Sequence, residues 1–204
     1  IEAGLALFYD SFAEDAFTAP GEKKTYVQLT DSVKENVMAR ERARILAAAA
    51  AGLGAIFTCN GNKAELSVGY ATFYGDLAFA AQADLWKYQV YAASHHFQGL
   101  FPDAPLDQIA AIRPSAELSP NQDVTKGLGD PLIYAYHDYL LKSWVEGGQT
   151  PADTLLAYRN GRLEEEIGCA PGLVRQLFAD AAALIADIEY WWRMYRVVGT
   201  AKRI

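Results

Sequence analysis

Cysteine, histidine and long apolar runs are all scarce in this chain of 204 residues. Its two cysteines, Cys59 and Cys169, are too few for a disulfide framework or a zinc cluster, and they favour a reducing, cytoplasmic setting. The apolar run Ala47–Ala51 is far shorter than the roughly 20 residues that cross a membrane, so no membrane partner is expected. No signal peptide is visible, and the start at Ile1 suggests a longer gene product.

The charge balance is acidic, with 25 Asp and Glu against 18 Lys and Arg and a net charge of −7. This balance argues against a nucleic-acid partner, but it is compatible with a small basic pocket for a phosphorylated ligand. GxGxxG, Walker and nucleophile-elbow motifs are all missing. The composition, 51% hydrophobic and 21% charged, is typical of a globular protein. We therefore expect a single compact unit over residues 1–204.

Apolar periodicity and capping signals predict a chain that is rich in helix. Two start signals are clear: Ser32-Val33-Lys34-Glu35 fits a capping box, and Thr150-Pro151 fits an N-cap followed by proline. The predicted helices cover about 1–17, 33–51, 63 onwards, 84–97, 132–145, 150–159 and, as one amphipathic helix, 173–191.

Two short segments are predicted to be β-strands. Ala55–Cys59 is apolar and β-prone, which indicates a buried strand of a parallel sheet, and Ile109–Ile112 is a second candidate. The first is followed by the turn Asn60-Gly61-Asn62 and then by a helix. This helix–strand–loop–helix order predicts an α/β fold with a parallel sheet.

The carboxyl end of the predicted strand is the expected ligand edge, because parallel sheets bind ligands there. That edge carries Asn60, Gly61 and Asn62, with Glu65 in the first turn of the next helix. The Glu65 carboxylate has two open interpretations. The first is a cap on the helix N-terminus, and the second is a ligand that also holds Mg²⁺ on phosphate oxygens.

A second candidate region is the helix predicted from residue 33. Asn36 and Arg40 are four residues apart and share a face, and Arg42 and Arg44 make the helix locally basic. Arginine suits carboxylate or phosphate recognition. The alternative is a solvated face on which Glu41 pairs with an arginine.

Other conspicuous side chains carry no clear functional pattern. His95, His96 and His137 lack metal-ligand spacing and are expected at the surface or in packing. Trp191-Trp192 and the tyrosine-rich stretch Tyr134–Tyr139 are expected in the core or at a subunit interface.

Several segments resemble, in order, the motifs of NAD⁺ synthases. They are Glu35–Arg40 (ENxxAR in the family), Asn60–Glu65 with Gly69–Asp76 ((T/N)GNKxE…GYxTxYGD), Asp84–Tyr91 (DLxKxxVY), Pro114–Leu118 (P(S/T)A(D/E)L) and Lys202-Arg203 (KR). The pattern is closer to the glutamine-dependent branch. The resemblance implies a Rossmann-like fold of the adenine-nucleotide alpha-hydrolase type, of which this chain would be the helix-rich C-terminal part.

The resemblance also implies an ATP-dependent amide ligase. In the family, the nicotinate carboxylate of deamido-NAD attacks the α-phosphate of ATP, and ammonia then displaces AMP. Mg²⁺ is the expected cofactor, and the expected partners are deamido-NAD, ATP and ammonia or glutamine. An amidase (glutaminase) domain in the same or a partner chain and a homo-oligomeric state are also implied.

Carried over residue by residue, the motifs imply seven site residues. Asn36, Arg40 and Lys202 would bind deamido-NAD, Asn60, Lys87 and Ser115 would bind ATP, and Glu65 would hold Mg²⁺.

The sequence also departs from the family pattern. The SGGxDS loop that cradles pyrophosphate does not occur in it, so the chain is expected to be inactive alone. Phe73 stands where the ammonia-using branch has a lysine, and Phe79 where a glycine is common. Two alternatives therefore stay open: a non-catalytic fragment that serves dimerisation or domain packing, and another ATP-pyrophosphatase ligase.

Overall fold

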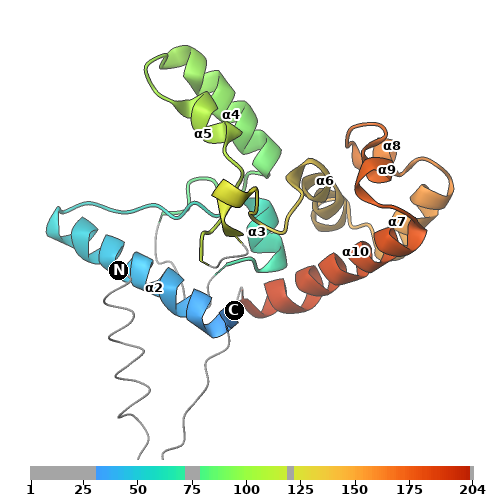
Figure 1. Cartoon of the computed structure of the whole chain (residues 1–204), viewed down its shortest axis with the longest axis horizontal. Helices are drawn as coiled ribbons and strands as arrows, with labels where there is room; N and C mark the ends of the chain where they lie inside the picture. The colour runs from blue at the N-terminus through green and yellow to red at the C-terminus, as the bar shows by residue number, and fades with distance from the viewer. Residues whose placement is uncertain (1–30, 72–78, 119–121, 203–204) are drawn as a thin grey trace, which may run out of the picture.

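The computed structural model describes residues 31–71, 79–118 and 122–202, and this part of the chain is rich in helix (Figure 1). The predicted helix over residues 1–17 lies outside it, as does Phe73. The elements are α2 (Asp31–Gly52), α3 (Lys63–Val68), α4 (Lys87–Leu100), α5 (Leu106–Ala111), η2 (Val124–Lys126), α6 (Tyr134–Val145), α7 (Pro151–Arg159), α8 (Leu163–Ile167), α9 (Leu173–Leu177), α10 (Ala181–Arg193), η3 (Met194–Gly199) and α11 (Thr200–Lys202).

Most of the predicted helices are confirmed, and several end where their signals place them. The helix predicted from residue 33 to Gly52 is confirmed as α2, Asp31–Gly52. The capping box predicted at Ser32 involves a side chain outside the described ones. Thr150 caps α7, because its side chain accepts from the Asp153 amide and the Asp153 carboxylate accepts from the Thr150 amide. Within the described ranges, no helix has the length and apolar character to cross a bilayer.

Three element predictions need correction. The candidate strand Ile109–Ile112 falls instead in α5 and its C-cap, because a short apolar run fits either period. The amphipathic helix predicted over residues 173–191 is divided into α9 and α10. Asp180 causes the division, since its side chain accepts a 2.8 Å hydrogen bond from the Ala183 amide and so starts a new helix. The helix predicted from Asp84 begins later, at Lys87.

The predicted strand Ala55–Cys59 is reduced to one isolated parallel bridge, between Thr58 and Phe79. Two backbone hydrogen bonds accompany it, from the Cys59 amide to the Phe79 carbonyl (3.1 Å) and from the Phe79 amide to the Phe57 carbonyl (3.0 Å). A buried parallel strand needs partners on both sides, and none of the described residues supplies a second one. A parallel sheet is therefore not seen in the described part of the chain.

The core is centred on α6, which packs against α3, α4 and α8. Its buried side chains include Tyr136, Leu140, Leu141 and Trp144, and they meet the apolar face of α10. The α10 face is the one that the predicted three- and four-residue spacing describes. In contrast, α4 and α5 pair with each other and project from this body, and α2 lies at the opposite end from α7–α9 (Figure 1).

A contact between two glycines joins the C-terminal segment to α3. Gly69 ends α3 in the left-handed region (φ 71°), and a Cβ on it would lie 2.9 Å from the Gly199 Cα. A Cβ on Gly199 would overlap the carbonyl oxygen of Ser67. Gly199 ends the π-helical segment η3, so the close approach fixes where the chain continues into α11.

Replacing Gly199 with alanine tests this contact. We expect Gly199→Ala to lower the free energy of unfolding by about 1–3 kcal/mol, because the new methyl group must push η3 away from rigid backbone. Thermal unfolding followed by circular dichroism measures the change. Gly52→Ala is the matched control, because a Cβ on Gly52 meets no atom within 4 Å. Equal melting temperatures for the two variants would show that the contact does not constrain the fold.

Candidate functional site

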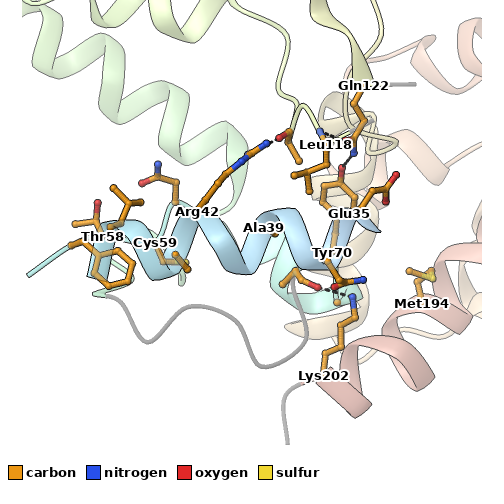
Figure 2. A pocket seen from close by; sticks show the side chains of 18 residues that line it. Glu35, Ala39, Arg42, Thr58, Cys59, Tyr70, Leu118, Gln122, Met194 and Lys202 are labelled. Carbon is orange, nitrogen blue, oxygen red and sulfur yellow. Dashed lines mark hydrogen bonds between the residues drawn. The ribbon is translucent and has the colours of Figure 1, made fainter. Parts of the chain in front are cut away.

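A cavity of about 410 Å³ lies where α2, the segment 57–60, the C-cap of α3 and the C-terminal helix meet (Figure 2). Of the seven predicted site residues, Asn36, Asn60 and Lys202 line it. These three come from parts of the chain far apart in sequence. The remaining lining residues are Glu35, Ala39, Arg42, Ala43, Leu46, Phe57, Thr58, Cys59, Gly69, Tyr70, Ala71, Ala116, Leu118, Gln122 and Met194.

One face of α2 forms a wall of this cavity, with Asn36 and Arg42 among its residues at three- and four-residue spacing. The predicted deamido-NAD contact Arg40 is half-buried beside this face and does not line the cavity. Arg44 turns to solvent and pairs with Glu41 at 2.7 Å, which confirms the solvated-face interpretation for that pair. Arg42 is therefore the arginine that α2 brings to the cavity.

Arg42 ties α2 to the loop that resembles the P(S/T)A(D/E)L motif (Figure 2). Its guanidinium donates to the carbonyl oxygens of Ala116 (2.8 Å) and Glu117 (3.2 Å). Glu117 has a positive φ of 50°, a conformation that a non-glycine residue holds only when its surroundings enforce it. The sequence shows Arg42 only as part of a basic helix, because its carbonyl partners lie more than 70 residues away.

Ser115, the predicted ATP contact in this loop, already has partners within it. Its hydroxyl donates to the Gln122 carbonyl oxygen at 2.6 Å and accepts from the Glu117 amide at 3.1 Å. The Gln122 side chain in turn accepts from the Leu118 amide at 2.9 Å. Ser115 thus shapes the loop while Ala116 and Leu118 line the cavity.

Lys202 reaches the cavity from the C-terminal helix. Its ammonium donates a 2.6 Å hydrogen bond to the carbonyl oxygen of Ala71 (Figure 2). Partial burial lowers the pKa of the Lys202 ammonium, because its charged form loses hydration. The contact between Gly69 and Gly199 lies just before this lysine in the chain and sets its position.

Glu65 acts as a helix cap, which confirms the first of its two interpretations. Asn62 and Glu65 form a reciprocal capping box, in which the Asn62 side chain accepts from the Glu65 amide at 3.1 Å. Glu65 Oε2 accepts from the Asn62 amide at 3.0 Å, and Oε1 accepts from Asn62 Nδ2 at 2.7 Å. Burial raises the pKa of the Glu65 carboxyl above its ordinary value, while hydrogen bonds from Tyr134 and Asn62 act to lower it.

A chain of hydrogen bonds links Glu65 to the cavity. The Tyr134 hydroxyl lies 2.7 Å from Glu65 Oε1 and 3.0 Å from Asp130 Oδ2, and its one proton serves one carboxylate at a time. The Tyr70 hydroxyl donates to Asp130 Oδ1 at 3.0 Å and accepts from the Gln122 amide group. We call Glu65, Tyr134, Asp130, Tyr70 and Gln122 the carboxylate cluster. Tyr70 and Gln122 also line the cavity, so the two features are continuous.

Lys87 lies beside the carboxylate cluster rather than in the cavity wall. Its ammonium is 5.2 Å from the centroid of the Tyr134 ring and 5.8 Å from that of Tyr91. Its positive charge acts to lower the pKa of Glu65. The sequence points to Glu65 and Lys87 through their motifs, but it places Tyr134 only among tyrosines expected in the core or an interface. The partner that decides Tyr134's role is 69 residues away.

The carboxylate cluster can supply only part of a magnesium site. No group of three His, Cys, Asp or Glu side chains in the described part of the chain is arranged to hold a metal ion. Glu65 Oε1 accepts from Asn62 and shares the Tyr134 proton with Asp130, while Oε2 accepts one hydrogen bond and keeps a lone pair for a cation. One carboxylate with phosphate oxygens and waters is a common set of Mg²⁺ ligands, and Glu65 fits that pattern.

The histidines lie away from this chemistry. His95 and His96 are exposed on α4. His137 is buried in α6, where its Nδ1 accepts from the Ile133 amide at 2.8 Å and its Nε2 lies 3.2 Å from Asp187. His137 therefore joins α6 to α10.

Comparison with known proteins gives the family. Residues 11–165 match the NAD synthase family. The chain belongs to this family. A glutamine-dependent NAD(+) synthetase of Aquifex aeolicus is 34% identical over 127 residues, which are 61% of this chain and 22% of the relative. Those of Thermotoga maritima and Synechocystis are 30% and 35% identical, over 78% and 66% of this chain and 25% and 23% of the relatives.

The chain spans about a quarter or less of the length of the curated relatives that it matches. A solved glutamine-dependent NAD+ synthetase of Acinetobacter baumannii, in complex with adenosine diphosphate, is 23% identical over 81% of this chain and 26% of that one. The TM-score of 0.40 is too low for residues of the two structures to be compared in space.

Replacing Tyr134 with phenylalanine tests the carboxylate cluster. We expect Tyr134→Phe to raise the pKa of Glu65 further, because it removes a hydrogen bond that stabilises the ionised carboxylate. It should also lower the free energy of unfolding by about 1 kcal/mol at neutral pH. A raised pKa means that the folded protein binds the proton more tightly than the unfolded chain does. Stability therefore falls as pH rises from the ordinary value of 4.5 through the folded value, and it falls further in the variant.

Carboxyl carbon NMR titration measures this pKa directly, and thermal unfolding at several pH values measures the stability. Tyr190→Phe is the control, since the Tyr190 side chain is half exposed on α10. A Glu65 titration that is unchanged in Tyr134→Phe would contradict the described hydrogen bond.

Proposed function

We propose that this chain forms part of a glutamine-dependent NAD⁺ synthetase, which amidates deamido-NAD to NAD⁺ at the expense of ATP. One observation supports this proposal above all others. Asn36, Asn60 and Lys202 belong to three separate family motifs, and they line one cavity. That cavity has room for part of a dinucleotide, since small-molecule sites measure about 300–1,000 Å³.

The reaction has two steps. A carboxylate oxygen of the nicotinate group attacks the α-phosphorus of ATP, and the bond to pyrophosphate breaks. Ammonia then adds to the acyl carbon, loses a proton and expels AMP, which leaves the amide. Negative charge accumulates on phosphate oxygens in the first step, so placed cations lower its barrier.

We assign the residues of this chain to binding roles in that reaction. Asn36, Arg40 and Lys202 bind deamido-NAD, and Arg42 holds the loop 114–118 against the same cavity. Asn60, Lys87 and Ser115 bind ATP, with Lys87 next to the phosphates. Lys87 suits that task because its ammonium carries no hydrogen-bonded carboxylate among its described contacts.

Glu65 would hold Mg²⁺ through the Oε2 atom, which keeps a lone pair. The ion would neutralise charge on the phosphates of ATP as it develops. A cation is needed there because the carboxylates of Glu65, Asp130 and Asp138 would by themselves repel a triphosphate. Tyr134 would orient Glu65 through the 2.7 Å hydrogen bond.

The remaining partners follow from the relatives. The matched relatives are named as glutamine-dependent, and this chain covers 22–25% of the three that we compare. The protein is therefore proposed to work with an amidase domain, in the same or a partner chain, that releases ammonia from glutamine. A Rossmann-like parallel sheet, a homo-oligomeric state and a cytoplasmic location belong to the same proposal.

The test is NAD⁺ formation by the full-length protein, with an SGGxDS segment preceding Ile1. Deamido-NAD, ATP, Mg²⁺ and glutamine or ammonia should give NAD⁺, AMP and pyrophosphate in equal amounts. The proposal is wrong if no NAD⁺ forms with either nitrogen donor. Product formed instead from xanthosine monophosphate, or from citrulline and aspartate, would identify another ligase of the same type.

Lys202 gives a sharper form of this test. Lys202→Ala should raise the KM for deamido-NAD about 10- to 100-fold, as expected for the loss of a charged hydrogen bond to the ligand. Lys126→Ala is the matched control, because the Lys126 ammonium pairs with Asp123 at 2.8 Å on an exposed turn. An unchanged KM in Lys202→Ala would remove Lys202 from the site.

A further inference from the structure

Asp138 is a buried carboxylate that lies outside the motifs named above. It lies in α6 with a side chain that is 0% exposed. Its Oδ2 accepts a 2.8 Å hydrogen bond from the Tyr88 amide in the first turn of α4. Its Oδ1 is one of two buried side-chain oxygens without a hydrogen-bond partner in the described part of the chain.

The charge on Asp138 is costly to the fold. Burial raises the pKa of the Asp138 carboxyl from its ordinary value of 3.8 to about 6, so folding at neutral pH must bury an ionised group. The neutral amide of asparagine has the same shape and could accept the same hydrogen bond from Tyr88. Packing and capping by themselves therefore do not require the negative charge.

Lys87 carries the positive charge that acts on Asp138. It is the first residue of α4, and its positive charge acts to lower the pKa of Asp138. The charge of Asp138 acts to raise the pKa of the Tyr91 hydroxyl on α4, and the like charge of Glu65 on α3 acts to raise the pKa of Asp138. The N-terminal end of a helix favours an anion, which places the carboxylate where it holds both the first turn of α4 and its lysine.

The position of Lys87 depends on the same two helices. Its ammonium lies over the Tyr134 ring, which α6 carries one turn before Asp138. The Tyr134 hydroxyl bonds to Glu65 and Asp130. A shift of the first turn of α4 relative to α6 would therefore move Lys87 away from the carboxylate cluster.

We propose that Asp138 is a positioning residue for Lys87. Its buried carboxylate holds the first turn of α4 and keeps the lysine ammonium over the ring of Tyr134. The geometry is a property of this chain. Its consequence for ATP binding rests on the proposed function.

The position of Lys87 is measured without any ligand, by NMR of its ε-methylene group. The rings of Tyr134 and Tyr91 should shift this resonance upfield in the native chain. Asp138→Asn should move it toward the value of a free lysine, because the neutral amide no longer attracts the ammonium. Asp103→Asn, on the exposed loop between α4 and α5, should leave it unchanged. A Lys87 resonance that stays at its native position in Asp138→Asn would overturn the proposal.

The melting temperature at neutral pH gives a second test. It should rise in Asp138→Asn, whereas a purely structural role of the charge predicts that it falls. The raised pKa of Asp138 means that native stability is lost as pH rises from about 4 to about 6. Asp138→Asn lacks this loss, so its melting temperature should match the native chain near pH 4 and exceed it at pH 7.5. A variant that is less stable at pH 7.5 would show that the charge supports the fold instead.

The link to ATP is tested by a double-mutant cycle in the full-length protein. Asp138→Asn should raise the KM for ATP severalfold with a smaller change in kcat, and it should have no further effect in a Lys87→Ala background. Additive effects of the two changes would contradict action through Lys87. If the native protein makes no NAD⁺, the proposed function fails, and the Lys87 resonance still decides the role of Asp138.

Discussion

The close contact between Gly69 and Gly199 is the constraint on which the described site depends. It lets the backbone of η3 lie directly against the last turn of α3, with no side chain between them. Because α3 follows the segment Asn60-Gly61-Asn62 and η3 leads to Lys202, the contact brings both ends of the cavity together. No combination of larger residues could allow this spacing, since any Cβ at Gly199 would overlap backbone.

Helix α6 connects this region to the core through two kinds of side chain. Its apolar residues, with Leu140 and Leu141 fully buried, pack in the core with α10 and give the body its stability. Its polar residues Tyr134 and Asp138 reach Glu65 and the first turn of α4. Buried polar groups of this kind are costly unless they are paired, so their concentration beside the candidate ATP contact is informative. One helix thereby couples the packing of the body to the placement of Lys87.

Sequence reasoning succeeded where the signal is local. The cap at Thr150, the start of α3 at Lys63 and the end of α2 at Gly52 each depend on residues within one turn of helix. It failed where a short apolar run fits two periods, as at Ile109–Ile112, and where an internal cap divides a periodic segment, as at Asp180. The strand predicted at Ala55–Cys59 is reduced to one bridge to Phe79, because a strand extends only as far as another segment pairs with it, and the described residues pair with it only there.

The sequence by itself determined the family, the local caps and the residues that motifs carry, including Asn36, Asn60, Glu65 and Lys202. These follow from residue type and short spacing, which do not change when the chain folds. Only the tertiary structure decided that Arg42 and not Arg40 lines the cavity, that Ser115 bonds within its own loop, and that Tyr134 and Asp138 surround Lys87. The contacts of Arg42, Tyr134 and Asp138 join different elements, so their distances depend on how the helices pack. The contact of Ser115 depends on how its loop folds back on itself.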